Sequence, residues 1–358
     1  MCLLKLTWRT STCEELRASC HHTSTSSWSS CRFDPNQSAS VTTRRDTMAV
    51  TKADFTLPTL GAKLDHIHQE TINGIGFKVV RGLPVDRYSI EDAALAFWGL
   101  GTYFGAAMSQ NKVGHLLGHV RDIGNDPAHP LSRPYTTRLP QPYHNDNSDI
   151  VALLCLKTAK SGGASSWCSS HTVHNEVLRR RPDLYKVLTE PIYQDRKDEI
   201  PAGKKPYYAM SVFHHYQGYL TVAGASFVEV VHRHEGVPPL SSIQREALDF
   251  LQEVAAEEGV RIDSVLQPGD ISICNNVSVW HSRTAFEDHK EQDRKRHMLR
   301  LWLASPIGWP LPDIYEERWG STEVGNRGFI NCPGFTPNVS LDPFEAHLQR
   351  IAATAKAA

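Results

Sequence analysis

The sequence predicts a mainly β fold with flanking helices (α+β), in which antiparallel strands form the core. Many short apolar segments have the length of strands, few segments have helical periodicity, and the two kinds do not alternate as in a parallel βαβ sheet. Of the 358 residues, 40% are hydrophobic and 22% are charged, which is typical of a globular protein with a large core. We expect a single domain over residues 51–358.

Glycines, prolines and helix caps mark the elements of the first half of this domain. Ser89 followed by the acidic Glu91 is typical of a helix start, the apolar residues after it have helical spacing, and the pattern ends near Gly105. We therefore expect helices at 64–68 and 89–105, strands at 76–82 and 114–120, and a proline-rich loop at 127–142.

The second half begins with an almost unbroken apolar run at 149–156, which indicates a strand buried on both faces. The glycine-containing turn at 160–163 is expected to close a hairpin. Polar, aromatic-rich connections are expected between the two later helices. We expect those helices at 172–181 and 243–258, and further strands at 271–274, 278–281 and 298–304.

Residues 1–50 differ from the rest of the chain, because they are rich in Ser, Thr, Cys and Arg and have no sustained periodicity. We expect them to be disordered or to form an extension outside the fold. A mitochondrial leader is the alternative, although Glu14 and Glu15 do not suit such a peptide. Met48 is an alternative start, which would leave residues 1–47 out of the native protein. The expected localisation is cytoplasmic.

Charge and cysteine content exclude several classes of protein. The chain has 38 Lys and Arg against 39 Asp and Glu, so it has no global field that would attract nucleic acid or an anionic membrane. No apolar stretch approaches the roughly 20 residues of a transmembrane helix. The cysteines are scattered singly and do not resemble a disulfide framework; we expect those in apolar stretches to be core residues in a reducing compartment. They are Cys2, Cys13, Cys20 and Cys31 near the N-terminus and Cys155, Cys168, Cys274 and Cys332 in apolar stretches.

Two histidines and an aspartate form a candidate metal site. In an extended strand His144 and Asp146 point the same way, so both can bind one metal ion. His281 ends the second of two strand-like segments and can supply another nitrogen, although a core histidine is the alternative interpretation. Two histidines and one carboxylate leave positions of iron(II) open for a bidentate co-substrate and O2. The same ligands suit zinc, so a metal-dependent hydrolase is an alternative.

Other histidines compete with His281 for the third ligand position. His289 lies in a charged stretch that is expected to be solvated, and His297 is expected on the strand face opposite Arg296 and Arg300. His214 and His215 follow no recognisable site turn but remain candidates.

A basic cluster runs directly into the last apolar strand. Arg296, Met298 and Arg300 alternate to one face of this strand, so they can share a pocket. A guanidinium can hold a carboxylate through two parallel hydrogen bonds, which suits the far end of a dicarboxylic co-substrate. The alternative is a solvated basic turn, which fits Arg294 and Lys295 better than Arg300.

Together these motifs resemble the taurine dioxygenase (TauD/TfdA) family of iron(II)- and 2-oxoglutarate-dependent oxygenases. The resemblance implies a double-stranded β-helix, or cupin-like jelly roll, with iron at one mouth bound by His144, Asp146 and His281. It also implies that Arg296 pairs with the distal carboxylate of 2-oxoglutarate and that the hydroxyl of Ser165 assists. The resemblance covers about residues 70–306 and depends on the order and spacing of His144-Asn-Asp146, Ser161 to Trp167, Gly269 to His281, Arg283 to Phe286 and Arg294 to Arg300.

The reaction that the resemblance implies is the oxidation by O2 of an unactivated C–H bond in a small molecule, with release of succinate and CO2. The expected substrate is an amino acid, a small acid or an intermediate of secondary metabolism. Arg300 matches an arginine that faces the substrate in some relatives, and Gln110, Asn145 and Phe213 are further candidate pocket residues. A non-catalytic jelly-roll binding protein is a second alternative, and homo-oligomerisation is left open.

Overall fold

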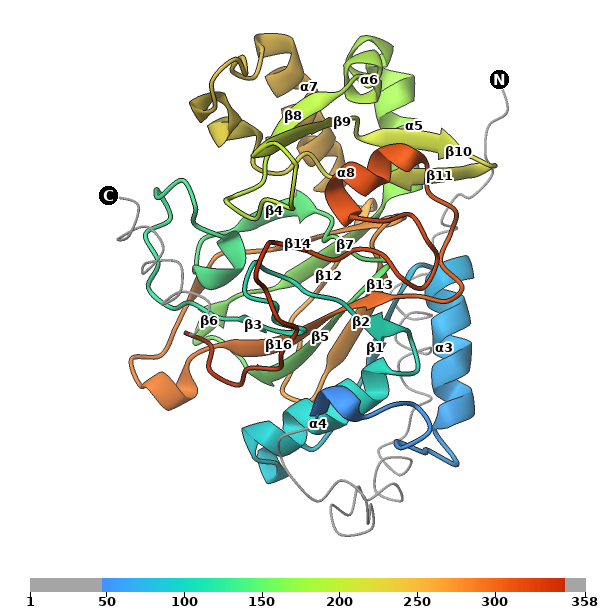
Figure 1. Cartoon of the computed structure of the whole chain (residues 1–358), viewed down its shortest axis with the longest axis vertical. Helices are drawn as coiled ribbons and strands as arrows, with labels where there is room; N and C mark the ends of the chain where they lie inside the picture. The colour runs from blue at the N-terminus through green and yellow to red at the C-terminus, as the bar shows by residue number, and fades with distance from the viewer. Residues whose placement is uncertain (1–46, 345–358) are drawn as a thin grey trace.

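Two antiparallel sheets lie against each other at the centre of the protein, with helices on both outer sides (Figure 1). The computed structural model describes residues 47–344. The expected extension over residues 1–50, and the leader considered for it, therefore lie almost entirely outside the described residues. The strands of both sheets pair in antiparallel fashion, which confirms the prediction of a mixed fold with an antiparallel core.

The larger sheet has six strands in the order β1-β13-β5-β16-β2, and β3 also pairs with β16. The predicted apolar run at 149–156 corresponds to β5 in the middle of this sheet. Both faces of β5 are apolar because one packs on helices and the other on the second sheet. The strands are β1 (Phe77–Val80), β2 (Ala106–Ala107), β3 (Leu117–Val120), β5 (Ile150–Lys157), β13 (Ile271–Asn275) and β16 (His297–Ala304).

The smaller sheet has four strands in the order β12-β7-β14-β4. Successive residues of its strands point to opposite sides: Trp167 stacks on Phe77 of the larger sheet with ring centroids 5.5 Å apart, whereas Cys168 faces the helices beyond. This sheet therefore has one face toward the interior between the sheets and one toward a second core. The strands are β4 (Gln141–His144), β7 (Ser165–Ser169), β12 (Arg261–Ser264) and β14 (Val279–Arg283).

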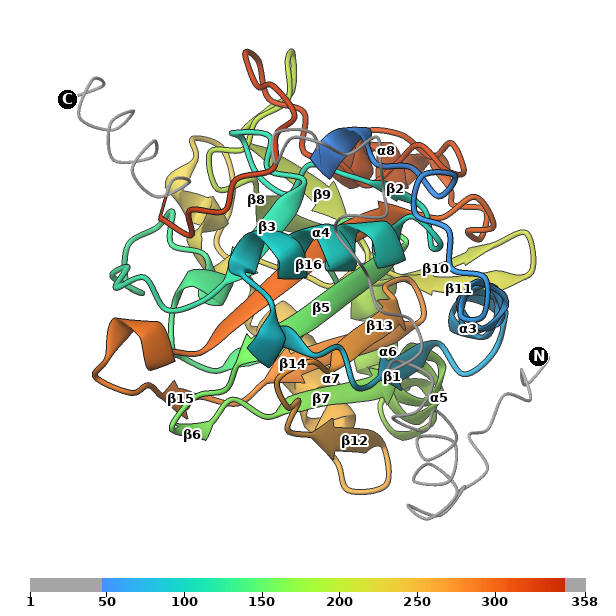
Figure 2. The ribbon, with the colours of Figure 1, turned by 90° about the horizontal axis from the view of Figure 1, so that it is seen from below.

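Helices cover the outer face of each sheet. Figure 2 shows α4 lying across the strands of the larger sheet, where α3 and α4 bury their apolar residues. The predicted cap of α4 is confirmed, since the hydroxyl of Ser89 accepts a hydrogen bond from the backbone N–H of Asp92. Three further helices, α5, α6 and α7, pack on the smaller sheet (Figure 1). The helices are α3 (Gly61–Asn73), α4 (Ile90–Gly101), α5 (Ser170–Arg180), α6 (Pro182–Thr189), α7 (Ser242–Ala255) and α8 (Glu316–Trp319).

The predicted hairpin at residues 160–163 is wrong. Gly162 and Gly163 have φ angles of +72° and +73°, and the turn that they form carries the chain from β5 in the larger sheet to β7 in the smaller one. The polar connections expected after α5 also contain regular structure, in strands of only four residues that leave little periodic signal. The paired short strands are β6 (Ser161–Gly162) with β15 (Phe286–Glu287), β8 (Ile192–Asp195) with β9 (Tyr207–Met210), and β10 (Phe213–Tyr216) with β11 (Tyr219–Val222).

Short 3-10 turns join several of these elements. They are η1 (Thr47–Ala49), η2 (Val85–Arg87), η3 (Pro134–Thr136), η4 (Val228–Arg233), η5 (Gln292–Arg294) and η6 (Asp313–Tyr315).

Residues 47–344 show whether four of the cysteines are free and whether any helix could cross a membrane. Cys155, Cys168, Cys274 and Cys332 are buried free thiols, as the sequence predicted, and the four N-terminal cysteines lie outside the described residues. None of the helices in this range combines the length and the apolarity needed to cross a bilayer.

Candidate metal centre

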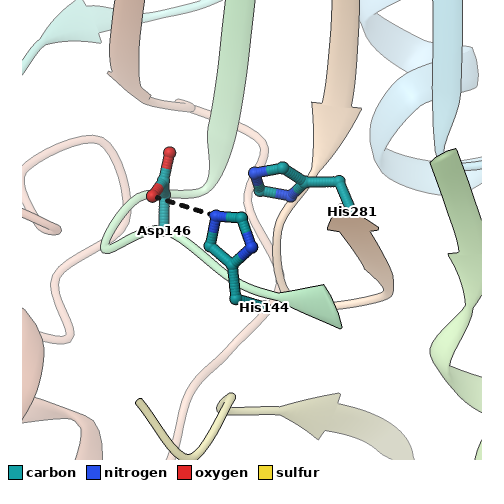
Figure 3. A group of neighbouring side chains, drawn as sticks. All are labelled: His144, Asp146 and His281. Carbon is teal, nitrogen blue, oxygen red and sulfur yellow. Dashed lines mark ion pairs between the residues drawn. The ribbon is translucent and has the colours of Figure 1, made fainter. Parts of the chain in front are cut away.

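Strand pairing brings His144 and His281 together. His144 is the last residue of β4 and lies directly opposite His281 in the middle of β14, so their ring centroids are 4.2 Å apart. Asp146 follows two residues after β4, and its carboxylate points toward the imidazoles (Figure 3). One ligand atom from each of the three side chains lies within 4.8 Å of the others. The three predicted ligands therefore form one cluster, although His281 is central in its strand rather than at its end.

The protonation states of this cluster suit a divalent cation. Burial lowers the pKa of His144 and lowers that of His281 to about 3, so both imidazoles are neutral and offer a lone pair. Burial alone would raise the pKa of Asp146, but the charge of Arg300 and the hydrogen bond from Trp302 act against it, and that pKa is held well below its usual range. The buried Nδ1 of His281 has no hydrogen-bond partner among the described residues. Two neutral nitrogens and one ionised oxygen fit iron(II).

Two donors from β16 fix the orientation of Asp146. Trp302 donates from Nε1 to Oδ2 over 2.9 Å, and Arg300 donates from Nη1 to the same oxygen over 3.1 Å. Arg300 is held in turn by Gln110, whose Oε1 accepts from its Nε over 2.7 Å. Gln110 also donates to the carbonyl oxygens of Arg300 and Leu116. Gln110 thus lies behind Arg300. Its amide, which was expected to face the substrate, is instead used in these hydrogen bonds.

A small cavity of about 40 Å³ adjoins the three clustered residues. Ser165 and Arg296, the residues expected to hold 2-oxoglutarate, both line it together with His281. Arg283 also lines it, two residues beyond His281 on the same face of β14. Burial lowers the pKa of Arg296, and burial with the nearby charge of Arg296 lowers the pKa of Arg283 to about 9. Besides Arg300, which pairs with Asp146, the cavity therefore carries two cations that are both removed from water.

A larger cavity of about 350 Å³ is also lined by His144 and Asp146. Its walls come from the segment between β8 and β9, from the region of α8, and from Asn145 and Arg300. Several of its charges are already paired: Arg133 with Glu199, and Arg196 and Lys204 with Glu317. Its polar lining and its position next to the candidate ligands make it a candidate cavity for a substrate.

Arg318 connects this cavity to the loop that carries Asp146. It is 8% exposed and donates to the backbone oxygens of Asn145 and Gly224 and to Oδ1 of Asn147. Because Asn145 and Asn147 flank Asp146, this guanidinium fixes the loop on both sides of the carboxylate. No local motif marks Arg318, since its role follows from contacts between distant parts of the chain.

The remaining predicted residues fall in different places. Asn145 lines the larger cavity, where its amide nitrogen donates to the backbone oxygens of Asn276 and Val279. Phe213 is buried in the core under α5 and α6, stacks on Tyr185, and lines neither cavity. The substrate role expected for Phe213 is therefore not supported.

The competing histidines lie apart from the cluster. His297 forms a 2.8 Å hydrogen bond with His119 on the other face of β16, and His214 bonds to the backbone oxygen of Ser211. Within residues 47–344, the metal-binding group that the geometry identifies contains neither these histidines nor His215 or His289.

The antiparallel fold and the cluster of two histidines and an aspartate are those expected of an iron(II)- and 2-oxoglutarate-dependent oxygenase. The chain belongs to the family described as taurine catabolism dioxygenase TauD, TfdA family, whose model matches residues 41–302. It is therefore an enzyme of this oxygenase class, as predicted. The comparisons give no support to the alternatives of a hydrolase or a non-catalytic binding protein.

Relatives of this chain come from bacteria and fungi. It is 28% identical over 258 residues to FR-33289 synthase of Streptomyces rubellomurinus, covering 69% of this chain and 75% of the relative. It is 29% identical over 272 residues to taurine hydroxylase-like protein SAT17 of Stachybotrys chartarum, covering 72% and 69%. Among solved structures, an asparagine oxygenase in complex with Fe(II), 3-hydroxyasparagine and succinate matches with a TM-score of 0.55 at 19% identity, covering 74% of this chain and 87% of that one. This structural likeness concerns the fold alone.

Proposed function

We propose that His144, Asp146 and His281 bind iron(II) and that the adjoining small cavity receives 2-oxoglutarate. The observation that carries this assignment is the cluster of three ligand atoms within 4.8 Å, next to a cavity lined by buried cations. When both are bound, iron(II) and 2-oxoglutarate supply the oxidising chemistry, in which O2 is consumed, succinate and CO2 are released, and a C–H bond of the substrate is oxidised. The part of the protein is to orient these groups and to exclude water.

Arg296 is the proposed partner of the distal carboxylate of 2-oxoglutarate. Its guanidinium is buried, its Nη1 has no hydrogen-bond partner among the described residues, and its Nη2 contacts only the sulfur of Met298. The hydroxyl of Ser165 lines the same cavity and can donate to a carboxylate. Leu153 and Trp167 supply apolar walls, which strengthen the attraction between a guanidinium and a carboxylate by keeping water away.

The substrate that we propose is a small polar molecule, such as an amino acid, a small acid or an intermediate of secondary metabolism. The larger cavity supports this choice, because about 350 Å³ holds a small molecule and its lining contains acidic, basic and amide groups. The similar proteins agree with a small substrate: one relative is FR-33289 synthase, and one solved structure is an asparagine oxygenase in complex with 3-hydroxyasparagine. Arg300 and Asn145 are the proposed substrate-facing residues, because both line this cavity beside Asp146.

For the fold we propose a double-stranded β-helix, or jelly roll, within a single domain over residues 51–358. The support is that the chain passes from the larger to the smaller sheet between β5 and β7, and again between β13 and β14. Such crossings are what two facing sheets of a jelly roll require.

Anaerobic titration of the purified apoprotein with Fe(II) and then 2-oxoglutarate tests the metal assignment. We expect a weak visible charge-transfer band, because the co-substrate would chelate the iron through its keto and carboxylate oxygens. His281→Ala is expected to abolish the band and the iron-dependent activity, since a nitrogen ligand is lost. The matched control His289→Ala should retain both. A band that survives in His281→Ala but disappears in His289→Ala would overturn the ligand assignment.

A further inference from the structure

Arg283 is a buried cation whose hydrogen-bonding capacity is largely unused. Its side chain is 6% exposed, and its Nη2 donates to the backbone oxygens of Thr137 and Leu139. Its Nε and Nη1 have no hydrogen-bond partner among the described residues. An unpaired buried donor costs stability, and a buried guanidinium without an anion costs more. Nη2 alone holds the loop at Thr137 and Leu139, so this loop does not explain why Nε and Nη1 are buried without an acceptor.

Arg296 presents the same unused capacity to the same small cavity. Its Nη1 is also without a partner among the described residues, and both guanidiniums lie against the ring of Phe286, at 4.8 Å for Arg283 and 5.1 Å for Arg296. Two like charges enclosed together repel each other unless an anion lies between them. The cavity that they line also contains Ser165 and His281.

Within residues 47–344, no carboxylate forms an ion pair with Arg283 or Arg296. Asp288 acts on both arginines and Asp122 acts on Arg283, yet neither carboxylate lies within ion-pair distance of these guanidiniums. Oδ1 of Asp288 accepts instead from the backbone N–H of Arg296. The two acids therefore act only at longer range, and the unpaired guanidinium nitrogens beside the cavity have no carboxylate in direct contact among the described residues.

We propose that Arg283 is a second binding residue for the distal carboxylate of 2-oxoglutarate, which it holds together with Arg296. The proposal rests on the function proposed above, since it takes the small cavity as the co-substrate site. Nη2 of Arg283 is used on the loop, but Nε and Nη1 remain, and each can donate a single hydrogen bond to a carboxylate oxygen. Arg283 then selects a 2-oxo acid with a second carboxylate over a 2-oxo monoacid.

The test is the binding of two 2-oxo acids to the full-length protein loaded with Fe(II) under anaerobic conditions. The probes are 2-oxoglutarate and 2-oxopentanoate, which has the same chain length but no distal carboxylate, and the readout is the charge-transfer band. In Arg283→Met we expect the Kd for 2-oxoglutarate to rise on the order of 10- to 100-fold, the range for losing hydrogen bonds to a charged group. The Kd for 2-oxopentanoate should change less than about twofold.

Two further variants separate recognition from folding. Arg283→Lys keeps a cation that can reach the loop carbonyls, so it should recover much of the preference for 2-oxoglutarate. Arg138→Met removes an exposed arginine from the same loop and should leave both Kd values unchanged. If Arg283→Met raises the Kd of both acids equally, or if Arg283→Lys binds both acids with the same Kd, Arg283 only holds the loop and the proposal fails. If the unaltered protein gives a band with neither acid, the proposed function itself fails.

Discussion

Asp146 receives its two shorter hydrogen bonds from β16 on a single oxygen. Trp302 and Arg300, two residues apart on one face of the strand, donate to Oδ2 over 2.9 and 3.1 Å, whereas Arg300 reaches Oδ1 only over 3.4 Å, so Oδ1 remains the more accessible oxygen for a cation. A carboxylate that is held in this way keeps its orientation whether or not a metal is bound. The position of Asp146 is therefore set by β16 as much as by the loop in which it lies.

Trp302→Phe is expected to weaken Fe(II) binding by roughly tenfold, because it removes the indole N–H that orients Asp146 while keeping most of the ring. The measurement is anaerobic Fe(II) affinity by competition with a chelating dye. Trp309→Phe is the matched control, since the indole of Trp309 bonds weakly to Asn73, over 3.4 Å, far along the chain from the candidate ligands. Unchanged affinity in Trp302→Phe would show that Arg300 alone suffices to orient the carboxylate.

At the scale of elements, the pairing of β3 with β16 depends on Gly118, a residue without a side chain. Gly118 lies opposite Arg300 in this pair, and a Cβ at Gly118 would come within 2.4 Å of Oε1 of Gln110. The space is thus filled by the amide that holds Arg300. The short edge strand β3 therefore helps to position Gln110, which holds Arg300, which in turn contacts Asp146.

Gly118→Ala is expected to push the Gln110 amide away from Arg300 and to lower the free energy of unfolding by about 1–3 kcal/mol, because buried donors lose their acceptor. Urea unfolding followed by circular dichroism measures this change. In a Gln110→Ala background the same substitution should cost much less, since the side chain that clashes is gone. Equal costs in both backgrounds would contradict the role given to Gln110.

Elements with a strong local pattern could be predicted from the sequence. The apolar run at 149–156 predicts a buried strand and Ser89 predicts a helix cap. Both patterns are local, and β5 and α4 confirm both predictions. The hairpin at 160–163 was wrong because a glycine turn looks the same whether its strands pair with each other or enter different sheets. The four-residue strands β8 to β11 are too short for periodicity to distinguish them from loops.

The residues of the candidate site also divide into those that a local sequence pattern predicts and those that it does not. His144, Asp146 and His281 stand out because they follow recognisable strand patterns, and their clustering agrees with that expectation. Arg283 and Trp302 gain their positions from how β14 and β16 face each other across the sheets, which no local spacing specifies. Phe213 is the opposite case, since this candidate pocket residue, chosen from its place in the sequence pattern, lies in the core.

At the scale of the whole molecule, many histidines are buried in their neutral form. Burial lowers the pKa of His297 to about 2, and it lowers the pKa of His68, His171 and His214 to about 4. In the unfolded chain a histidine titrates near pH 6.5, so below that pH the unfolded state binds protons that the folded state does not. Stability is therefore complete above about pH 6.5 and falls as the pH decreases toward 4.

His297→Gln is expected to reduce the slope of unfolding free energy against pH by about 1.4 kcal/mol per pH unit between pH 6 and 4.5, because one proton fewer is bound on unfolding. Urea titrations of the metal-free protein across this range measure the slope. Glutamine can keep a hydrogen bond to His119, which limits other losses. His66→Gln, at an exposed position, is the control and should leave the slope unaltered; an equal effect of both substitutions would rule out burial as the cause.

The larger cavity draws one wall from α8 and the residues up to Asn331, all of which follow β16 and lie beyond residue 302, where the family match ends. The candidate metal ligands, by contrast, come from β4, the loop after it and β14. This terminal segment is tied to the rest of the fold at two buried arginines. Arg327 pairs with Asp149, just before β5, over 2.6 Å, and Arg318 holds the loop on both sides of Asp146. One wall of the larger cavity thus lies outside the family match, and Arg318 joins that wall to the loop that carries a candidate ligand.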